Sequence, residues 1–340
     1  MFGKPGTSFQ DYQLIQTLAV GGMARIHLAK KKHSSQTVVL KLLHTYLVTE
    51  PNVLSMFFDE IRLLEQLHSP HIPRMLHATS LQPKQTLEDL VDACLQGDEN
   101  AHPFIALEYV PGCDLAHLMK KCFKKGRGFP IPIAVDFALQ LLKALHDLHN
   151  ARTPDGRPLS LVHRDFSPPN ILVGVTGKIK VTDFGISLHS CMARQTTGTD
   201  PKGKFSYIAP ELQQGLSIDQ RADLFSWGAI FWEMLMGQRL FLAATPEKTL
   251  LQVKEMPIPD LREQLPELPQ ALCVLIQKAL LRDREQRYHN AEEIIVELES
   301  LRKQNHLISA ESDISNFIKQ NDGITYPPLP KYDDKNSSRR

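Results

Sequence analysis

The chain has 340 residues, of which 42% are hydrophobic and 23% charged, enough to bury a large core and unlike a disordered or fibrous protein. A formal net charge of +1 gives no overall electrostatic reason to bind nucleic acid or a membrane surface. The five cysteines are scattered and form no C-x-x-C pair, which is typical of a reducing cytosol and indicates neither disulfides nor a zinc site.

The first part of the chain reads as short strands interrupted by one helix. Phe57, Ile61, Leu64 and Leu67 recur at helical spacing and predict that helix. Three segments are rich in strand-forming residues and are separated by turn-like breaks: 12–20, 25–30 and 37–43.

After Pro111 the chain becomes mainly helical. Apolar residues from Ile133 to Leu148 recur at helical spacing, and segments 223–236 and 268–281 predict further helices. The apolar run 224–237 carries Glu233 and is too short to span a membrane, so we expect a buried helix there. The order of elements predicts an α+β fold with a small β-rich lobe (1–110) and a larger, mainly helical lobe (111–303).

Three segments stand outside this plan. Residues 80–103 are polar and acidic and read as a surface loop, with a regulator-binding site as the alternative. Residues 120–127 form a basic run that we expect at the end of a helix. Residues 304–340 are polar and read as a flexible tail.

Two features of the first part suit phosphate binding. Residues 18–26 read LAVGGMARI between two strands, and small residues at such a turn let the backbone approach a phosphate, although a plain hairpin fits as well. Lys41 ends the strand segment VVLK, where it could reach phosphates or lie exposed. Glu60, on the predicted helix, is a carboxylate that could hold Lys41.

The second part carries a series of short motifs in a fixed order. Residues 163–170 read HRDFSPPN, 183–185 read DFG, 209–211 read APE, 221–228 read RADLFSWG, and Arg287 follows. Each motif alone could arise by chance, but their order after a strand lysine could not easily do so. Residues 12–300 resemble the eukaryotic-like protein kinase family, and most of all the bacterial serine/threonine kinases of the myxobacterial type.

The resemblance implies a two-lobed kinase fold that binds Mg-ATP and transfers its γ-phosphoryl group to serine or threonine hydroxyls of proteins, including its own. Asp165 would orient the hydroxyl and accept its proton, while Asn170 and Asp183 would hold Mg²⁺. Lys41, paired with Glu60, would grip the nucleotide phosphates. The glycine pattern of the family falls on Ala19, Gly21 and Ala24, and the loop that covers the phosphates would comprise Leu18, Ala19, Val20, Gly21, Gly22, Ala24 and Ile26.

The resemblance also implies an adenosine site and two structural ties. Leu107 would be the gatekeeper, and backbone groups of Glu108 and Val110 would bond the adenine edge. Val39 and Leu172 would enclose the ring. The remaining implied contacts are a ribose contact from Asp114, an ion pair between Glu211 and Arg287, and a tie from Asp223 to the catalytic loop.

Two positions depart from the serine/threonine pattern. The resemblance implies lysine two residues after the catalytic aspartate and threonine in the substrate-docking segment, but this chain has Ser167 and Lys204 there. We hypothesise that Lys204 supplies the missing cation; the alternative is that it points to solvent. Arg164 precedes Asp165, which by resemblance predicts regulation by phosphorylation at Thr196, Thr197 or Thr199.

Two other classes of protein remain as alternatives: a pseudokinase scaffold that signals by binding, and a small-molecule kinase. The motifs at Lys41, Asp165 and Asp183 disfavour the first, and the APE motif disfavours the second. The amino terminus lacks the apolar run of a signal peptide, so we expect a soluble, cytoplasmic protein that acts on protein substrates and binds no nucleic acid.

Overall fold

The computed structural model describes residues 6–80, 86–184, 204–213 and 215–322. These residues divide into two compact units. The first holds the described residues up to Ile61 together with Arg74–Pro111, and the second holds Arg62–Pro73 and the described residues from Gly112.

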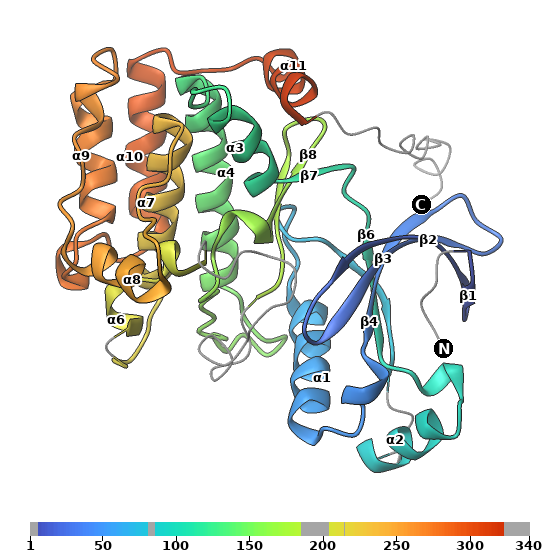
Figure 1. Ribbon diagram of the computed structural model, residues 1–340. Helices are drawn as coiled ribbons and strands as arrows, with labels where there is room; N and C mark the ends of the chain where they lie inside the picture. The colour runs from blue at the N-terminus through green and yellow to red at the C-terminus, as the bar shows by residue number, and fades with distance from the viewer. Residues whose placement is uncertain (1–5, 81–85, 185–203, 214, 323–340) are drawn as a thin grey trace. The chain divides into compact units, whose positions relative to one another are not determined.

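The first unit is built on an antiparallel sheet of six strands in the order β1-β2-β3-β4-β6-β5 (Figure 1). The strands are β1 (Ser8–Phe9), β2 (Tyr12–Val20), β3 (Ala24–Lys31), β4 (Thr37–Leu43), β5 (Met75–Ala78) and β6 (Phe104–Glu108). The strands expected at 12–20, 25–30 and 37–43 are thus confirmed as β2, β3 and β4.

Alternation along β4 decides which side chains enter the core of the sheet. Val38, Leu40 and Leu42 are buried in a cluster with aromatic residues of β1, β2 and β6. Because successive strand residues point to opposite faces, Val39 and Lys41 lie on the other face. Lys41 therefore lies on the face of the sheet opposite to this apolar cluster.

Helix α1 (Pro51–Gln66) confirms the helix predicted from apolar spacing. Its core-facing side chains Leu54, Phe57 and Ile61 are at most 5% exposed. Leu67, the last residue of the predicted ridge, lies one position beyond the helix and is also buried.

The loop expected over residues 80–103 is corrected by the structure. Thr86 begins helix α2 (Leu87–Leu95) with a capping box to Asp89, and a 3-10 turn η2 (Glu99–Ala101) follows. Leu90 and Cys94 of the helix are buried. Two apolar side chains and a well-capped amino end therefore stabilise a helix in a stretch whose acidic composition suggested a loop.

The second unit is mainly helical. Helices α4, α7 and α10 pack side by side, and α9 packs on α7 and α10 (Figure 1). The interpretation of the apolar run as a buried helix is confirmed, because almost all residues of α7 are buried, among them Leu224, Trp227 and Ile230. The helices are α3 (Leu115–Phe123), α4 (Ile131–His149), α6 (Pro210–Gln213), α7 (Arg221–Met236), α8 (Pro246–Glu255), α9 (Gln270–Ala279), α10 (Ala291–Gln304) and α11 (Glu311–Asp322).

A small antiparallel sheet carries the segments before and after the HRDFSPPN motif. Its order is β7-β8-β9, with β7 (Gly112–Asp114), β8 (Ile171–Gly174) and β9 (Ile179–Val181). The motif enters β8 through a 3-10 turn, η3 (Pro168–Asn170), and a second turn, η4 (Phe205–Tyr207), precedes α6. The basic run at 120–127 does lie at the end of a helix, α3, as expected.

The expectation of a flexible tail from residue 304 is wrong for Glu311–Asp322, which form α11 against α3 (Figure 1). Ile318 is fully buried, and the Phe317 ring meets Phe129 edge-on at 4.9 Å between centroids. A Cβ at Gly177 would lie 2.3 Å from Ile314 Cγ2, so the glycine makes room for α11. Ile314, Phe317 and Ile318, spaced at i, i+3 and i+4, thus pack this helix against the rest of the second unit. The polar composition of the segment had suggested a tail instead of a helix.

Along the described stretches, no helix combines the length and apolar character needed to cross a membrane.

Candidate active site

The HRDFSPPN segment is fixed by a buried carboxylate. Asp223 Oδ2 accepts from His163 N at 2.8 Å, and Oδ1 accepts from Arg164 N at 2.9 Å. Arg164 has a φ of 64°, a left-handed conformation that costs energy for a side-chain-bearing residue and is typical of functional sites. The expected tie between Asp223 and this loop is confirmed.

A histidine completes this arrangement. His149 Nε2 lies 2.8 Å from Asp223 Oδ2, and both side chains are almost fully buried. Burial alone would raise the pKa of Asp223, but the hydrogen bonds from His149 and His163 lower it below its usual value. The carboxylate therefore stays charged and keeps its grip on the loop.

Asp165, the predicted base, is held by two donors. Lys204 Nζ lies 2.7 Å from its Oδ2, and Asn170 Nδ2 donates to the same oxygen at 3.0 Å. In the described part of the chain both of these contacts fall on Oδ2, which leaves Oδ1 able to accept from another hydroxyl. The hypothesis that Lys204 supplies the missing cation agrees with this geometry, because the lysine pairs with the predicted base, whereas the alternative of a solvent-pointing lysine does not agree with it.

Ser167 stands where the family pattern has lysine. Its side chain is buried, at 1% exposure, and its hydroxyl lies 3.4 Å from Asp165 O. It therefore helps to shape the loop and brings no charge to Asp165.

Asn170 and Asp183 are brought together by the backbone. Thr182 N donates to Asn170 O at 2.9 Å, so the residue before Asp183 is joined to Asn170. Asp183 follows β9 with a φ of 55°, another strained position. Phe184 packs its ring 5.4 Å from that of His163, the packing role expected for both.

The amide of Asn170 fits a role as a ligand for Mg²⁺. Its Nδ2 donates both to Asp165 Oδ2 and to Asp165 O, which fixes the amide and leaves Oδ1 as the acceptor. A carboxylate and an amide oxygen are suitable ligands for Mg²⁺, which takes its other ligands from phosphate and water. Within the described residues, no group of three or more His, Cys, Asp or Glu side chains is placed to hold a metal.

Lys41 and Glu60 meet within the first unit. Lys41 Nζ lies 2.5 Å from Glu60 Oε1, and the two side chains are 13% and 14% exposed. The predicted pairing is confirmed. Because both groups are largely removed from water, the pair orients the lysine more firmly than a surface pair would.

The predicted phosphate loop is a hairpin between β2 and β3. Its turn is closed by Gly21 N donating to Ala24 O at 2.9 Å. Leu18 and Val20 are 46% and 48% exposed, whereas Ala24 is buried. Of the remaining loop residues, Ala19 lies on β2, Ile26 lies on β3, and Gly22 lies in the turn.

The predicted adenosine residues fall on both units. In the first, Leu107 pairs with Val39, Glu108 ends β6 and Val110 follows it. In the second, Leu172 on β8 is opposite Asp114 on β7. Asp114 Oδ1 accepts from His117 N at 2.7 Å and so caps α3, a task that sequence reasoning did not assign to it.

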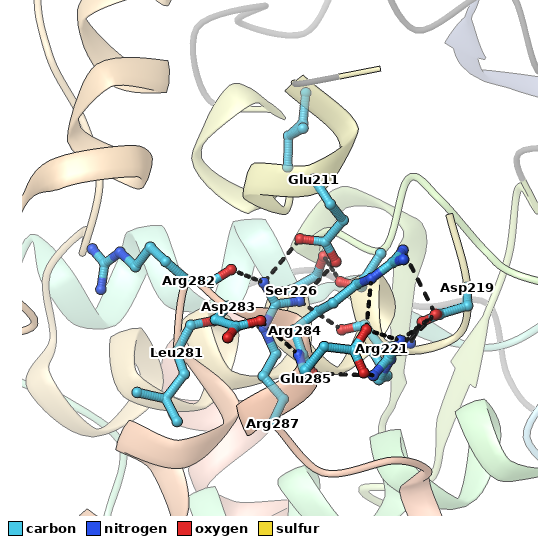
Figure 2. Close-up of polar contacts among 12 residues, drawn as sticks. Glu211, Asp219, Arg221, Ser226, Leu281, Arg282, Asp283, Arg284, Glu285 and Arg287 are labelled. Carbon is cyan, nitrogen blue, oxygen red and sulfur yellow. Dashed lines mark hydrogen bonds and ion pairs between the residues drawn. The ribbon is translucent and has the colours of Figure 1, made fainter. Parts of the chain in front are cut away.

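The expected ion pair between Glu211 and Arg287 is confirmed (Figure 2). Two parallel bonds of 2.7 and 2.8 Å join the guanidinium to the carboxylate. Arg287 also donates to the carbonyls of Leu281, Arg282 and Arg221, so all five of its N–H groups are used. Figure 2 shows a second cluster beside it, in which Arg221 bonds Asp219 and Glu285.

The side chain of Arg164 has an unsatisfied hydrogen-bond donor among the described residues. Its Nε is buried and lacks a hydrogen-bond partner among the described residues. Thr196, Thr197 and Thr199 lie outside the described residues, so the phosphorylation hypothesis stays a prediction.

The structure thus assembles two groups of predicted residues. Lys41 and Glu60 meet in the first unit, and Asp165, Asn170, Asp183 and Lys204 gather around the HRDFSPPN segment in the second. Sequence reasoning missed His149, because a histidine at the end of an amphipathic helix has nothing that distinguishes it.

Comparisons with known proteins agree with this geometry. The protein kinase domain model matches residues 12–297. The tyrosine-protein kinase MasK of Myxococcus xanthus is 31% identical over 315 residues, covering 92% of this chain and 46% of the relative. A probable serine/threonine-protein kinase of Clostridium perfringens is 30% identical over 307 residues, covering 88% of this chain and 40% of the relative.

The fold has a match among solved structures. The crystal structure of the Mycobacterium tuberculosis PknI kinase domain covers 88% of this chain and 99% of its own, with a TM-score of 0.59 at 20% identity. The chain spans less than half the length of both curated relatives. Because the family model matches residues 12–297, which is most of the chain, the chain belongs to the protein kinase domain family.

Proposed function

We propose that the protein transfers the γ-phosphoryl group of ATP to serine or threonine hydroxyls of proteins, itself among them. The observation that carries the proposal is the arrangement at Asp165, where one carboxylate oxygen is held by Lys204 and Asn170 and the other can accept a hydroxyl proton. The relative from Clostridium perfringens, whose name is probable serine/threonine-protein kinase, supports the choice of acceptor.

In the proposed reaction the substrate hydroxyl oxygen attacks the γ-phosphorus. The bond between that phosphorus and the β–γ bridging oxygen breaks, ADP leaves, and the hydroxyl proton passes to Asp165 Oδ1. Lys204, 2.7 Å from Oδ2, holds the aspartate and adds positive charge beside the reacting group.

Lys41, held by Glu60, would bind the nucleotide phosphates, and Asn170 Oδ1 and Asp183 would hold Mg²⁺. Mg²⁺ bound there would neutralise charge on the phosphate oxygens. The loop, adenine and ribose residues assigned by resemblance keep those roles as predictions. A regulator on residues 80–103 and a cytoplasmic location remain predictions as well.

The proposal is tested by incubating the protein with labelled ATP and a generic basic protein. We expect Asp183→Ala and Lys41→Met to abolish transfer, while circular dichroism and the unfolding midpoint stay close to wild type. A folded variant, free of contaminating kinase, that kept near-wild-type turnover would overturn the site assignment.

Tyrosine is a second candidate acceptor, and two observations favour it. Ser167 replaces the lysine of the serine/threonine pattern, and the relative from Myxococcus xanthus is named a tyrosine-protein kinase. Phosphoamino-acid analysis of the labelled products separates the two acceptors. The pseudokinase alternative has no support, because Lys41, Asp165, Asn170 and Asp183 are all present, Lys41 pairs with Glu60, and Asn170 bonds Asp165.

A further inference from the structure

His44 bonds the predicted phosphate loop in two ways. It is the first residue after β4, three positions beyond Lys41. Its backbone N donates to Met23 O at 2.9 Å, and its ring Nε2 lies 2.8 Å from Gly21 O. One residue therefore joins the turn of the hairpin to the end of the strand that carries Lys41.

The chemistry of the side-chain contact is defined. A carbonyl oxygen only accepts, so Nε2 must carry the proton, as it does in the neutral Nε2–H form and in the imidazolium. The ring stacks on Tyr46 with centroids 5.2 Å apart and an interplanar angle of 17°. Stacking on Tyr46 orients the ring so that its N–H points at Gly21 O.

The loop is a segment that benefits from such a tie. The β2–β3 ladder ends at the pair Val20–Arg25, so Gly21 to Met23 lie beyond its pairing. A Cβ at Gly22 would meet nothing within 4 Å, and neither glycine adopts a positive φ. The turn does not require glycine for its shape, and two adjacent glycines give it a freedom that nucleotide binding would have to remove.

We propose that His44 is a positioning residue for the phosphates of ATP: it holds the glycine turn in one conformation and so raises nucleotide affinity. The inference rests on the proposed function, since it requires the hairpin to cover a triphosphate. A tie that orders the free protein lowers the cost of ordering on binding, and therefore acts on affinity more than on turnover.

Two variants separate the bond from the ring. His44→Phe keeps an aromatic ring against Tyr46 but has no donor, whereas His44→Gln keeps an amide donor and loses the ring. Both keep the backbone bond to Met23 O. We expect His44→Phe to raise the Kd for Mg-ATP by ~3- to 10-fold, the effect of one ordinary hydrogen bond, with kcat within about 2-fold. His44→Gln should recover part of the affinity.

Adenosine provides the readout that a general structural defect would not give. It lacks phosphates, so its Kd, measured by titration calorimetry, should be the same for wild type and His44→Phe. Equal Mg-ATP affinity in wild type and His44→Phe, or a proportional loss of adenosine and Mg-ATP binding, overturns the role of His44. A folded wild-type protein that binds no Mg-ATP overturns the proposed function itself.

Discussion

Replacing Lys204 with methionine tests whether this lysine contributes to phosphoryl transfer. Methionine has a similar length and no charge, so Asp165 would lose its cation and keep the bond from Asn170. The ion pair has an N–O distance of 2.7 Å, and both side chains are 29% exposed. At an effective dielectric constant of about 20, two unit charges at that separation interact with ~6 kcal/mol, which is an upper bound.

Solvent contact reduces the effect of the charge on the rate. Loss of one preorganised group that stabilises transition-state charge costs ~10²–10³-fold in kcat, and the exposure of this pair places the expectation near ~10²-fold. The KM for ATP should change less than about 3-fold, because Lys204 contacts Asp165, which we propose orients the acceptor hydroxyl rather than ATP.

Steady-state kinetics with a peptide acceptor, at saturating and limiting ATP, measures the two effects separately. Lys143→Met is a matched control, since Lys143 pairs with Glu299 on the surface and is 45% exposed; its kcat should not change. Ser167→Lys combined with Lys204→Thr should restore part of the lost turnover. A folded Lys204→Met enzyme with wild-type kcat would refute the reasoning.

Two further predictions concern stability. Arg287→Met leaves Glu211 buried without its partner, so the free energy of unfolding, measured in urea, should fall by ~3–5 kcal/mol. The control Arg157→Met breaks an exposed ion pair and should not change the free energy of unfolding measurably. Equal effects of the two substitutions would contradict a stabilising role for the buried pair. Burial lowers the pKa of His102, although its bond to Leu43 O partly opposes this. The unfolded chain then binds the proton more readily, so stability is complete above the unfolded pKa of about 6.5 and falls as pH drops below it. Between pH 7.5 and 5.5, His102→Gln should lose less unfolding free energy than wild type, by up to ~1 kcal/mol, and an identical loss would show that His102 contributes nothing.

Local patterns in the sequence predicted most of the elements. The strand-forming residues of 37–43 and the spacing of the apolar residues in α1 and α4 are local signals, and each led to the right element. The motif residues were found because their motifs follow one another in the same order as in the family that the chain resembles; they are Asp165, Asn170, Asp183 and Asp223. The local composition and spacing of residues and the order of motifs can be recognised without knowing which residues are in contact in the folded protein.

The features that escaped prediction depend on contacts between distant residues. His44 bonds Gly21, 23 positions earlier, and His149 bonds Asp223, 74 positions later; neither leaves a periodic trace. Helix α2 is short and acidic, and only its cap and two buried side chains distinguish it from a loop. In α11 the pattern of Ile314, Phe317 and Ile318 was present, but polar neighbours obscured it.

The docking of α11 has a practical consequence for where this protein can be cut. The family match stops at residue 297, yet Ile318 is fully buried beyond it and Phe317 packs on Phe129. A chain shortened to the matched residues would end within α10, and it would expose to water Phe129 and the surface at Gly177 on which Ile314 packs. Such a fragment would expose apolar surface and tend to aggregate. The smallest fragment to express for activity measurements therefore extends through Asp322.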